Sequence, residues 1–177
     1  MWSCETQLMV TARDIVKNLA QGYQVDLVSL DFSKAFDRVP HRKLHCYIVR
    51  NNTLSWIQVF LTSKSQQVVL EGAHSSLAPA LSGIPQGTVL GPLLFVAYIN
   101  DLPDAVKSSN VRLFTDDSLL YRKICNQELL QQDLQYFEGW ENTWQMSFNP
   151  SKCNTIKFNQ ANKRAYSQQP TISMDNN

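Results

Sequence analysis

Apolar positions follow two different periods along the chain, and the change of period separates predicted helices from predicted strands. From Glu5 to Ala20 the apolar residues recur every three to four positions, which favours an amphipathic helix closed by Gly22. The run from Val25 to Leu30 is mostly apolar and predicts a largely buried strand that ends at Asp31. The start of the chain therefore predicts one helix followed by one strand.

The same reasoning places the other elements. Helices are expected over residues 41–52, 55–61, 91–101 and 127–144. Strands are expected over residues 66–70, 77–81, 111–114, 118–123 and 155–158. Because strands and helices are mixed without strict alternation, we expect an α+β fold in which helices pack on one face of an antiparallel sheet.

Length and composition indicate one globular domain. The chain has 177 residues, of which 44% are hydrophobic and 18% are charged, and its net charge is +1. After Asn159 the sequence turns polar, so we expect a domain over residues 1–159 and a disordered tail over residues 160–177. The longest apolar stretch, Pro92 to Ile99, is too short to span a bilayer, and no membrane association is expected.

Cysteine and histidine positions do not predict a zinc site. The cysteines are scattered without paired zinc-type spacing, at Cys4, Cys46, Cys125 and Cys153. His41 and His45 are four residues apart, but no second ligand pair follows, so ordinary surface histidines are the preferred interpretation. Free thiols and the lack of a signal-peptide pattern favour an intracellular protein of the cytoplasm or nucleus, not a secreted one.

A local basic stretch is the only strong bias in charge. No acidic residue occurs between Asp37 and Glu71, whereas five basic residues do: Arg38, Arg42, Lys43, Arg50 and Lys64. The stretch fits either a solvated helix face or a surface that binds nucleic acid.

Three aspartates stand at the ends of predicted strands. Asp116 and Asp117 are adjacent between two short strands, and Asp31 ends the first strand. Asp31 could simply cap the following helix, and the pair could be a solvated hairpin tip. The like charges make better sense if divalent cations bind there, because carboxylates from separate strands can hold two Mg²⁺ ions about 3.5–4 Å apart.

Two further segments give weaker signals. The loop from Ile84 to Gly87 precedes a helix that begins near Gly91, and it could let the backbone approach a phosphate or sugar, or simply start the helix. Lys152 follows a turn at Asn149 and could reach a leaving phosphate, although a surface lysine is the ordinary alternative.

Taken in order, these segments resemble the palm of a reverse transcriptase, specifically those of non-long-terminal-repeat (LINE-type) retrotransposons. The matching blocks are VSLDFSKAFDRVPH over residues 28–41, SGIPQGTVLGPLLF over residues 82–95 and LFTDD over residues 113–117. Residues 144–158 look like the next block, with Asn149 and Lys152 in place. The resemblance implies RNA-directed DNA polymerase activity on an RNA template, with a DNA primer and dNTPs.

The resemblance also implies roles for single residues. Asp31, Asp116 and Asp117, with the Phe32 carbonyl, would hold two Mg²⁺ ions, which Mn²⁺ could replace. Lys152 would donate a proton to the leaving group. The remaining substrate contacts would be an aromatic ring that excludes a 2′-hydroxyl and two residues along the nucleotide and template: Phe36, Gln86 and Gly87. Asp37 and Arg38 would be structural.

Two departures from the family pattern bear on activity. Thr115 stands where the family usually has alanine, and a β-branched residue favours strand geometry there. The chain also lacks most of the fingers and thumb that family members carry, so we expect a truncated fragment of a retroelement polymerase. A catalytically inactive palm remnant with weak, salt-sensitive nucleic-acid binding is the alternative. A palm-type nucleotide cyclase or two-metal nuclease explains neither Phe36 nor the Gln86-Gly87 loop.

Overall fold

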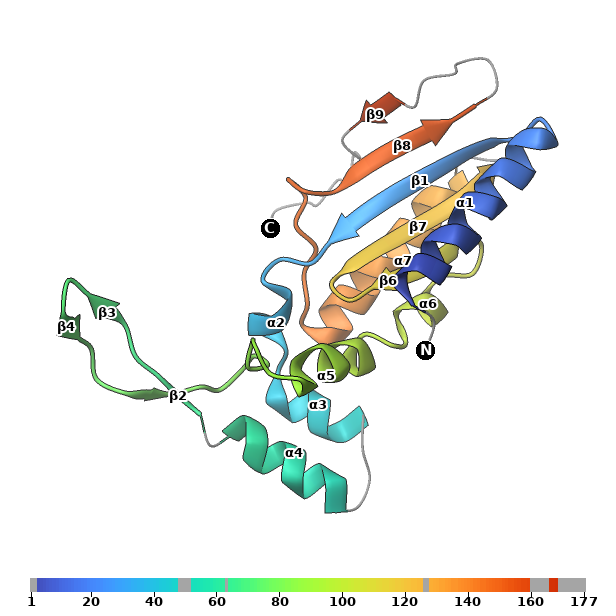
Figure 1. Ribbon diagram of the computed structural model, residues 1–177. Coiled ribbons are helices and arrows are strands. Elements are labelled where there is room, and N and C mark those ends of the chain that lie inside the picture. The colour runs from blue at the N-terminus through green and yellow to red at the C-terminus, as the bar shows by residue number, and fades with distance from the viewer. Residues whose placement is uncertain (1–2, 48–51, 63, 126–127, 160–165, 169–177) are drawn as a thin grey trace. The chain divides into compact units, whose positions relative to one another are not determined.

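The computed structural model describes residues 3–47, 52–62, 64–125, 128–159 and 166–168, and it divides into two compact units (Figure 1). The first, which we call the sheet unit, comprises residues 1–33, 101–143 and 147–177. The second, the helical unit, comprises residues 34–100 and 144–146.

The sheet unit is built on five antiparallel strands. The strands are β1 (Gln24–Asp31), β6 (Asn110–Phe114), β7 (Asp117–Ile124), β8 (Asn154–Phe158) and β9 (Tyr166–Gln168). Their order across the sheet is β6-β7-β1-β8-β9, and every neighbouring pair is antiparallel. The sequentially first strand therefore lies in the middle, between β7 and β8.

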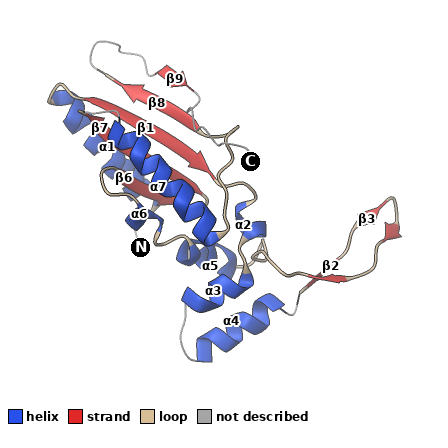
Figure 2. Cartoon of the chain, turned by 180° about the vertical axis from the view of Figure 1, so that it is seen from behind, coloured by secondary structure: helices blue, strands red, loops and turns tan. Residues whose placement is uncertain are grey.

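Helices cover both faces of this sheet. The sheet unit contains α1 (Cys4–Ala20), α6 (Leu102–Ala105) and most of α7 (Glu128–Trp144). On one face Ile15 of α1 packs with Val25 and Leu27, whereas on the other the ring of Trp140 in α7 lies 5.9 Å from that of Phe32. Figures 1 and 2 show α1 and α7 on opposite sides of the sheet.

The expected α+β class with an antiparallel sheet is confirmed, but the helices do not all lie on one face. Successive residues of a strand point to opposite faces of the sheet. The side chains of residues 25 and 27 therefore point to one face, and the side chain of Phe32 points to the other. Both sets are buried, so each face requires an apolar cover.

The helical unit contains four helices and two very short strand pairs. The helices are α2 (Ala35–Arg38), α3 (His41–Tyr47), α4 (Asn52–Thr62) and α5 (Leu90–Tyr98). The strands are β2 (Ser65–Gln66), β3 (Val69–Leu70), β4 (Ala73–His74) and β5 (Ala78–Pro79), paired as β2-β5 and β3-β4. The strands expected over residues 66–70 and 77–81 are thus present only in part, as short pairs whose residues are all exposed.

Several short elements differ from the sequence prediction. The helices α2 and α6 are only four residues long, too short for a periodic pattern to appear. The predicted extension of the helix from His41 through residues 48–51 lies outside the described residues. Among the described residues, no helix is long and apolar enough to cross a membrane.

One further strand lies within the segment predicted to be a disordered tail. Tyr166–Gln168 form β9 and pair with Thr155–Lys157 of β8, so the prediction is wrong for these three residues. Pairing uses backbone groups, which a polar sequence supplies as well as an apolar one. The rest of residues 160–177 lies outside the described residues.

Candidate active site

The register of the sheet brings the acidic residues together. Asp31, the last residue of β1, lies directly opposite Asp117, the first residue of β7. Phe114 also pairs with Asp117, so Thr115 and Asp116 form the two-residue turn between β6 and β7. Directly opposite residues of an antiparallel pair have Cβ atoms about 4.5–5.5 Å apart. Three carboxylates therefore gather at one end of the central strands.

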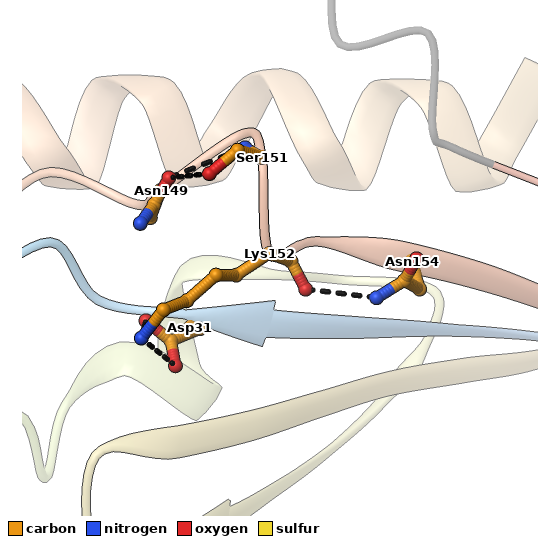
Figure 3. Close-up of polar contacts among 5 residues, drawn as sticks. All are labelled: Asp31, Asn149, Ser151, Lys152 and Asn154. Atoms are coloured by element: carbon orange, nitrogen blue, oxygen red, sulfur yellow. Dashed lines mark hydrogen bonds and ion pairs between the residues drawn. The ribbon is translucent and has the colours of Figure 1, made fainter.

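Lys152 places a positive charge on this acidic end of the sheet. Its Nζ lies 3.3 Å from Oδ2 of Asp31 and 3.4 Å from Oδ1, so the ammonium faces both carboxylate oxygens (Figure 3). The Lys152 side chain is mostly exposed, whereas that of Asp31 is largely covered. The lysine thus compensates one of the three negative charges.

A tight turn presents Lys152 to the sheet. The backbone N–H of Asn149 donates to the Asp31 carbonyl at 2.7 Å, and the Asn149 carbonyl accepts from the N–H of Lys152 at 3.0 Å. The Asn149 side-chain oxygen accepts from the backbone N–H and the hydroxyl of Ser151, at 3.2 and 2.7 Å (Figure 3). An asparagine that holds its own turn in this way is a common turn device. The turn that the sequence predicts at Asn149 is thus present, and the Asn149 side chain helps to hold it.

The electrostatics at the acidic end are unfavourable for a third negative charge. Partial burial raises the pKa of Asp117, and the charges of Asp116 and Asp31 raise it further, whereas Lys152 lowers it. Asp117 therefore holds its proton more readily than an isolated aspartate does. A cation at this place would relieve the repulsion.

The residues fit a divalent metal ion by their chemistry. Carboxylate oxygens are the donors that Mg²⁺ prefers, and the mutual repulsion of the three aspartates favours a cation. In the described parts of the chain, no group of three or more His, Cys, Asp or Glu side chains is arranged as a ready metal cluster. The donors are thus neighbours on paired strands, with one of them held by Lys152.

Phe32 anchors the exit of β1. Its ring is buried and stacks on Phe148 with 4.5 Å between the ring centroids, and the two residues form a β-bridge. The N–H of Ser33 then donates to the carbonyl of Ser147 at 2.7 Å. These contacts fix the direction in which the chain leaves Asp31.

The other predicted substrate residues lie in the helical unit. The Phe36 ring is half-buried and lies 4.9 Å from the ring of Phe95 in α5. Gln86 is exposed, and its Nε2 donates to Oδ1 of Asp37 at 3.2 Å. Gly87 has a φ of +76°, in the left-handed region where glycine is favoured. Phe36 and Asp37 are neighbours in α2, and Asp37 is hydrogen-bonded to Gln86. The helical unit therefore places Gln86 beside the helix that carries Phe36.

A cleft of about 840 Å³ opens in the helical unit beside Asp37 and Gln86. Its lining includes three basic residues, Lys34, Arg38 and Lys64, so part of the basic stretch noted in the sequence does gather on one concave surface. Arg42 is exposed and does not line it, and Arg50 lies outside the described residues.

His41 is not the surface histidine that the sequence predicts. It is buried, and its Nε2 lies 2.7 Å from the carbonyl oxygen of Gly83, a hydrogen bond that joins the start of α3 to the loop before α5. The side chain of His45 lies outside the described residues.

Comparison with known proteins agrees with these observations. Residues 4–171 match the family described as "Reverse transcriptase (RNA-dependent DNA polymerase)". The chain is 29% identical over 150 residues to the RNA-directed DNA polymerase from mobile element jockey of Drosophila melanogaster, covering 73% of this chain and 16% of that protein. It is 33% identical over 140 residues to a protein described as a probable RNA-directed DNA polymerase from transposon X-element of the same species, covering 73% and 15%.

The fold is similar to that of a solved structure. A structure of telomerase from Candida tropicalis in complex with a TWJ fragment of telomeric RNA superimposes with a TM-score of 0.66 at 12% identity, covering 98% of this chain and 34% of that one. The sheet with its flanking helices is therefore the polymerase palm fold. The chain spans about a sixth of the length of the jockey and X-element polymerases.

Proposed function

Because the chain belongs to the reverse transcriptase family, we propose that its acidic sheet end carries out RNA-directed DNA synthesis by two-metal nucleotidyl transfer. The relatives are named RNA-directed DNA polymerases. The observation that carries the proposal is the pairing of Asp31 with Asp117 across β1 and β7, beside Asp116 in the turn. Carboxylates that lie side by side on paired strands support a shared metal site.

Four oxygen donors would hold the two Mg²⁺ ions, which Mn²⁺ could replace: the carboxylates of Asp31, Asp116 and Asp117 and the backbone carbonyl of Phe32. When bound, such ions lower the pKa of the primer 3′-hydroxyl and stabilise the charge on the triphosphate. The buried ring of Phe32 keeps its own backbone fixed beside Asp31. Because Lys152 already contacts Asp31, it competes with a metal ion for that carboxylate.

The other residues would act on the substrate directly. Lys152 would donate a proton to the leaving pyrophosphate, since it is an exposed ammonium on a fixed turn. Phe36 would lie beneath the sugar and exclude a 2′-hydroxyl, and Gln86 and Gly87 would lie along the incoming nucleotide and the template. The substrates would be dNTPs, a DNA primer and an RNA template, and residues 1–159 would form the polymerase palm.

Primer extension tests the proposal. The 177-residue chain is incubated with a DNA primer annealed to RNA, dNTPs and Mg²⁺, and extension is compared with that of Asp116→Asn. We expect Mg²⁺-dependent extension that falls at least about 100-fold in the variant, because one metal ligand is lost. Asp104→Asn, at an exposed position of α6, makes the same charge change and is the matched control. No extension by a folded parent chain would refute catalysis by this chain.

A non-catalytic palm remnant that binds nucleic acid weakly is the second candidate function. The cleft lined by Lys34, Arg38 and Lys64 favours this function, because clustered cations bind the phosphates of a nucleic acid whatever its base sequence. Filter binding of RNA across a salt series, with and without Mg²⁺, separates the two candidates. A remnant binds without any dependence on Mg²⁺ and extends nothing.

A further inference from the structure

We infer that Asp37 is a positioning residue that fixes the side-chain amide of Gln86, so that Gln86 offers its carbonyl oxygen to the bound nucleotide. The inference rests on the proposed function and adds to it the direction of one hydrogen bond. Its observation is the contact between Nε2 of Gln86 and Oδ1 of Asp37, at 3.2 Å. Both residues belong to the helical unit.

The chemistry of the partner decides which end of the amide remains available. An amide has a donor end and an acceptor end that can exchange places by rotation. An ionised carboxylate only accepts hydrogen bonds, so Gln86 must turn its NH₂ group toward Asp37. One N–H of the Gln86 amide is then used by Asp37, and the carbonyl oxygen, which can only accept, is the acceptor that Gln86 offers to a ligand.

An acceptor selects among the groups of a nucleotide. Phosphate oxygens also accept, so they are not the partner of this oxygen. The donors of a nucleotide are its sugar hydroxyls and the amino groups of its bases. The Gln86 oxygen held by Asp37 therefore contacts the nucleoside part. The same cleft is lined by cations of the kind that contact phosphates: Lys34, Arg38 and Lys64.

The contact is held from both sides by backbone bonds between two segments. Ile84 N–H donates to the Phe36 carbonyl at 2.7 Å, and Gly83 N–H donates to the Val39 carbonyl at 2.9 Å. The hydroxyl of Ser82 donates to the Asp37 carbonyl at 3.2 Å. The loop that carries Gln86 is thus docked along residues 36–39, and Asp37 is in the centre of that segment.

Glycine at position 83 permits this close approach. Its φ is +91°, and a Cβ built there would lie 3.0 Å from the Asp37 carbonyl oxygen and 3.1 Å from its Cα. A side chain would push the loop away from α2. The backbone of Asp37 and the loop before Gln86 are therefore in direct contact, and the side-chain bond lies just beyond that contact.

Asp37 is also next to Phe36 in the chain, on the same four-residue helix α2. Phe36 is proposed to lie beneath the sugar of the nucleotide. Helix α2 thus carries the ring of Phe36, and through Asp37 it orients the amide of Gln86 toward the same nucleoside.

An exchange of the two side-chain types tests the inference. Gln86→Glu alone places two carboxylates in contact, which repel each other, so we expect the Kd for a dNTP on the chain with primed RNA and Mg²⁺ to rise about tenfold. Gln86→Glu with Asp37→Asn restores a donor-to-acceptor pair in reverse and leaves an acceptor oxygen free, so we expect the Kd to return to within about threefold of the parent.

The outcomes separate this inference from the proposed function. Rescue by the double variant supports positioning, because a merely structural effect of either change would add instead of cancel. Thermal unfolding of the parent and of both variants identifies any that fail to fold. If the parent binds and extends but the double variant is no better than Gln86→Glu, the inference is overturned and the proposed function stands. If the folded parent binds no dNTP, both are overturned.

Two nucleotide probes identify the donor. The parent and Gln86→Ala are compared with dATP and with 2′,3′-dideoxyATP. If a sugar hydroxyl is the donor, the parent prefers dATP about tenfold and Gln86→Ala loses that preference. If a base amino group is the donor, the exchange variants behave as predicted above, but the parent binds both nucleotides equally. Equal binding without rescue contradicts the inference.

Discussion

The Nζ atom of Lys152 lies 3.3 Å from Oδ2 of Asp31, so a side chain from the turn between α7 and β8 contacts the carboxylate that ends β1. The contact joins two segments that are 121 residues apart in the sequence. Among the described residues, Lys152 forms an ion pair with the acidic sheet end, where Asp31, Asp116 and Asp117 gather.

Removal of this lysine should make the chain more responsive to Mg²⁺. In Lys152→Gln, Asp31 has no ammonium beside it, so the melting temperature in EDTA should fall slightly and the increase on addition of Mg²⁺ should exceed that of the parent. Calorimetric melting at several Mg²⁺ concentrations measures both effects. Lys17→Gln, at an exposed position of α1, is the control. An unchanged Mg²⁺ response would argue against competition for Asp31.

Asp117 should make the stability depend on pH in a definite direction. Its pKa is raised in the folded chain, so it ionises more readily when unfolded, and its contribution to stability falls as pH rises from the unfolded value of about 3.9 through the folded pKa. Asp117→Asn should remove that loss. Because solvent screens the charge, the gain in the free energy of unfolding above the folded pKa should be at most about 0.5 kcal/mol. Urea unfolding in EDTA from pH 3.5 to 7 measures the difference, and a difference that does not vary with pH would contradict it.

Thr115 should destabilise the turn that carries the aspartates. Its φ is +58°, a left-handed conformation that is costly for a β-branched residue. Thr115→Gly should raise the free energy of unfolding by about 1 kcal/mol, because glycine adopts this conformation without strain. Thr115→Ala keeps a Cβ and should gain little, so it is the matched comparison in chemical denaturation. Equal gains would point to the hydroxyl instead.

Glu141 should support the segment that leads to Lys152. Its carboxylate accepts from the backbone N–H of buried Phe148, and burial raises its pKa. Glu141→Ala should cost about 1–3 kcal/mol, since it leaves that N–H without a partner. Glu141→Gln keeps an acceptor and removes a buried charge, so it should cost much less. Similar losses in both variants would show that the charge itself stabilises the segment.

The large elements of the fold could be predicted from the sequence because they have enough residues to show a period. The helix over residues 5–20 and the strand from Val25 match α1 and β1 closely. The strand β9 has three residues and a polar composition, so no pattern distinguished it from a tail. Its formation depends on the free edge of β8, which is a property of the assembled sheet.

The candidate site shows a similar division. The motifs indicated Asp31, Asp116 and Asp117, but only the strand register shows that Asp31 faces Asp117. The predicted strands end at residue 114 and resume at residue 118, so Thr115 is expected between them. It lies in the two-residue turn between β6 and β7, which overrides the preference of its β-branched side chain for strand geometry. The bond between Asp37 and Gln86 spans 49 residues, so local patterns give no sign of it.

Because Cys153 is buried, the rate at which its thiol is alkylated reports local opening of the fold. Its side chain is fully enclosed and burial raises the pKa of its thiol, whereas Cys4 and Cys125 are exposed. Since alkylating reagents attack accessible thiolates, they will modify the two outer cysteines first. Cys153 will be alkylated only as fast as the segment that follows Lys152 opens. Mass spectrometry of a timed alkylation thus reports how often the acidic end of the sheet opens.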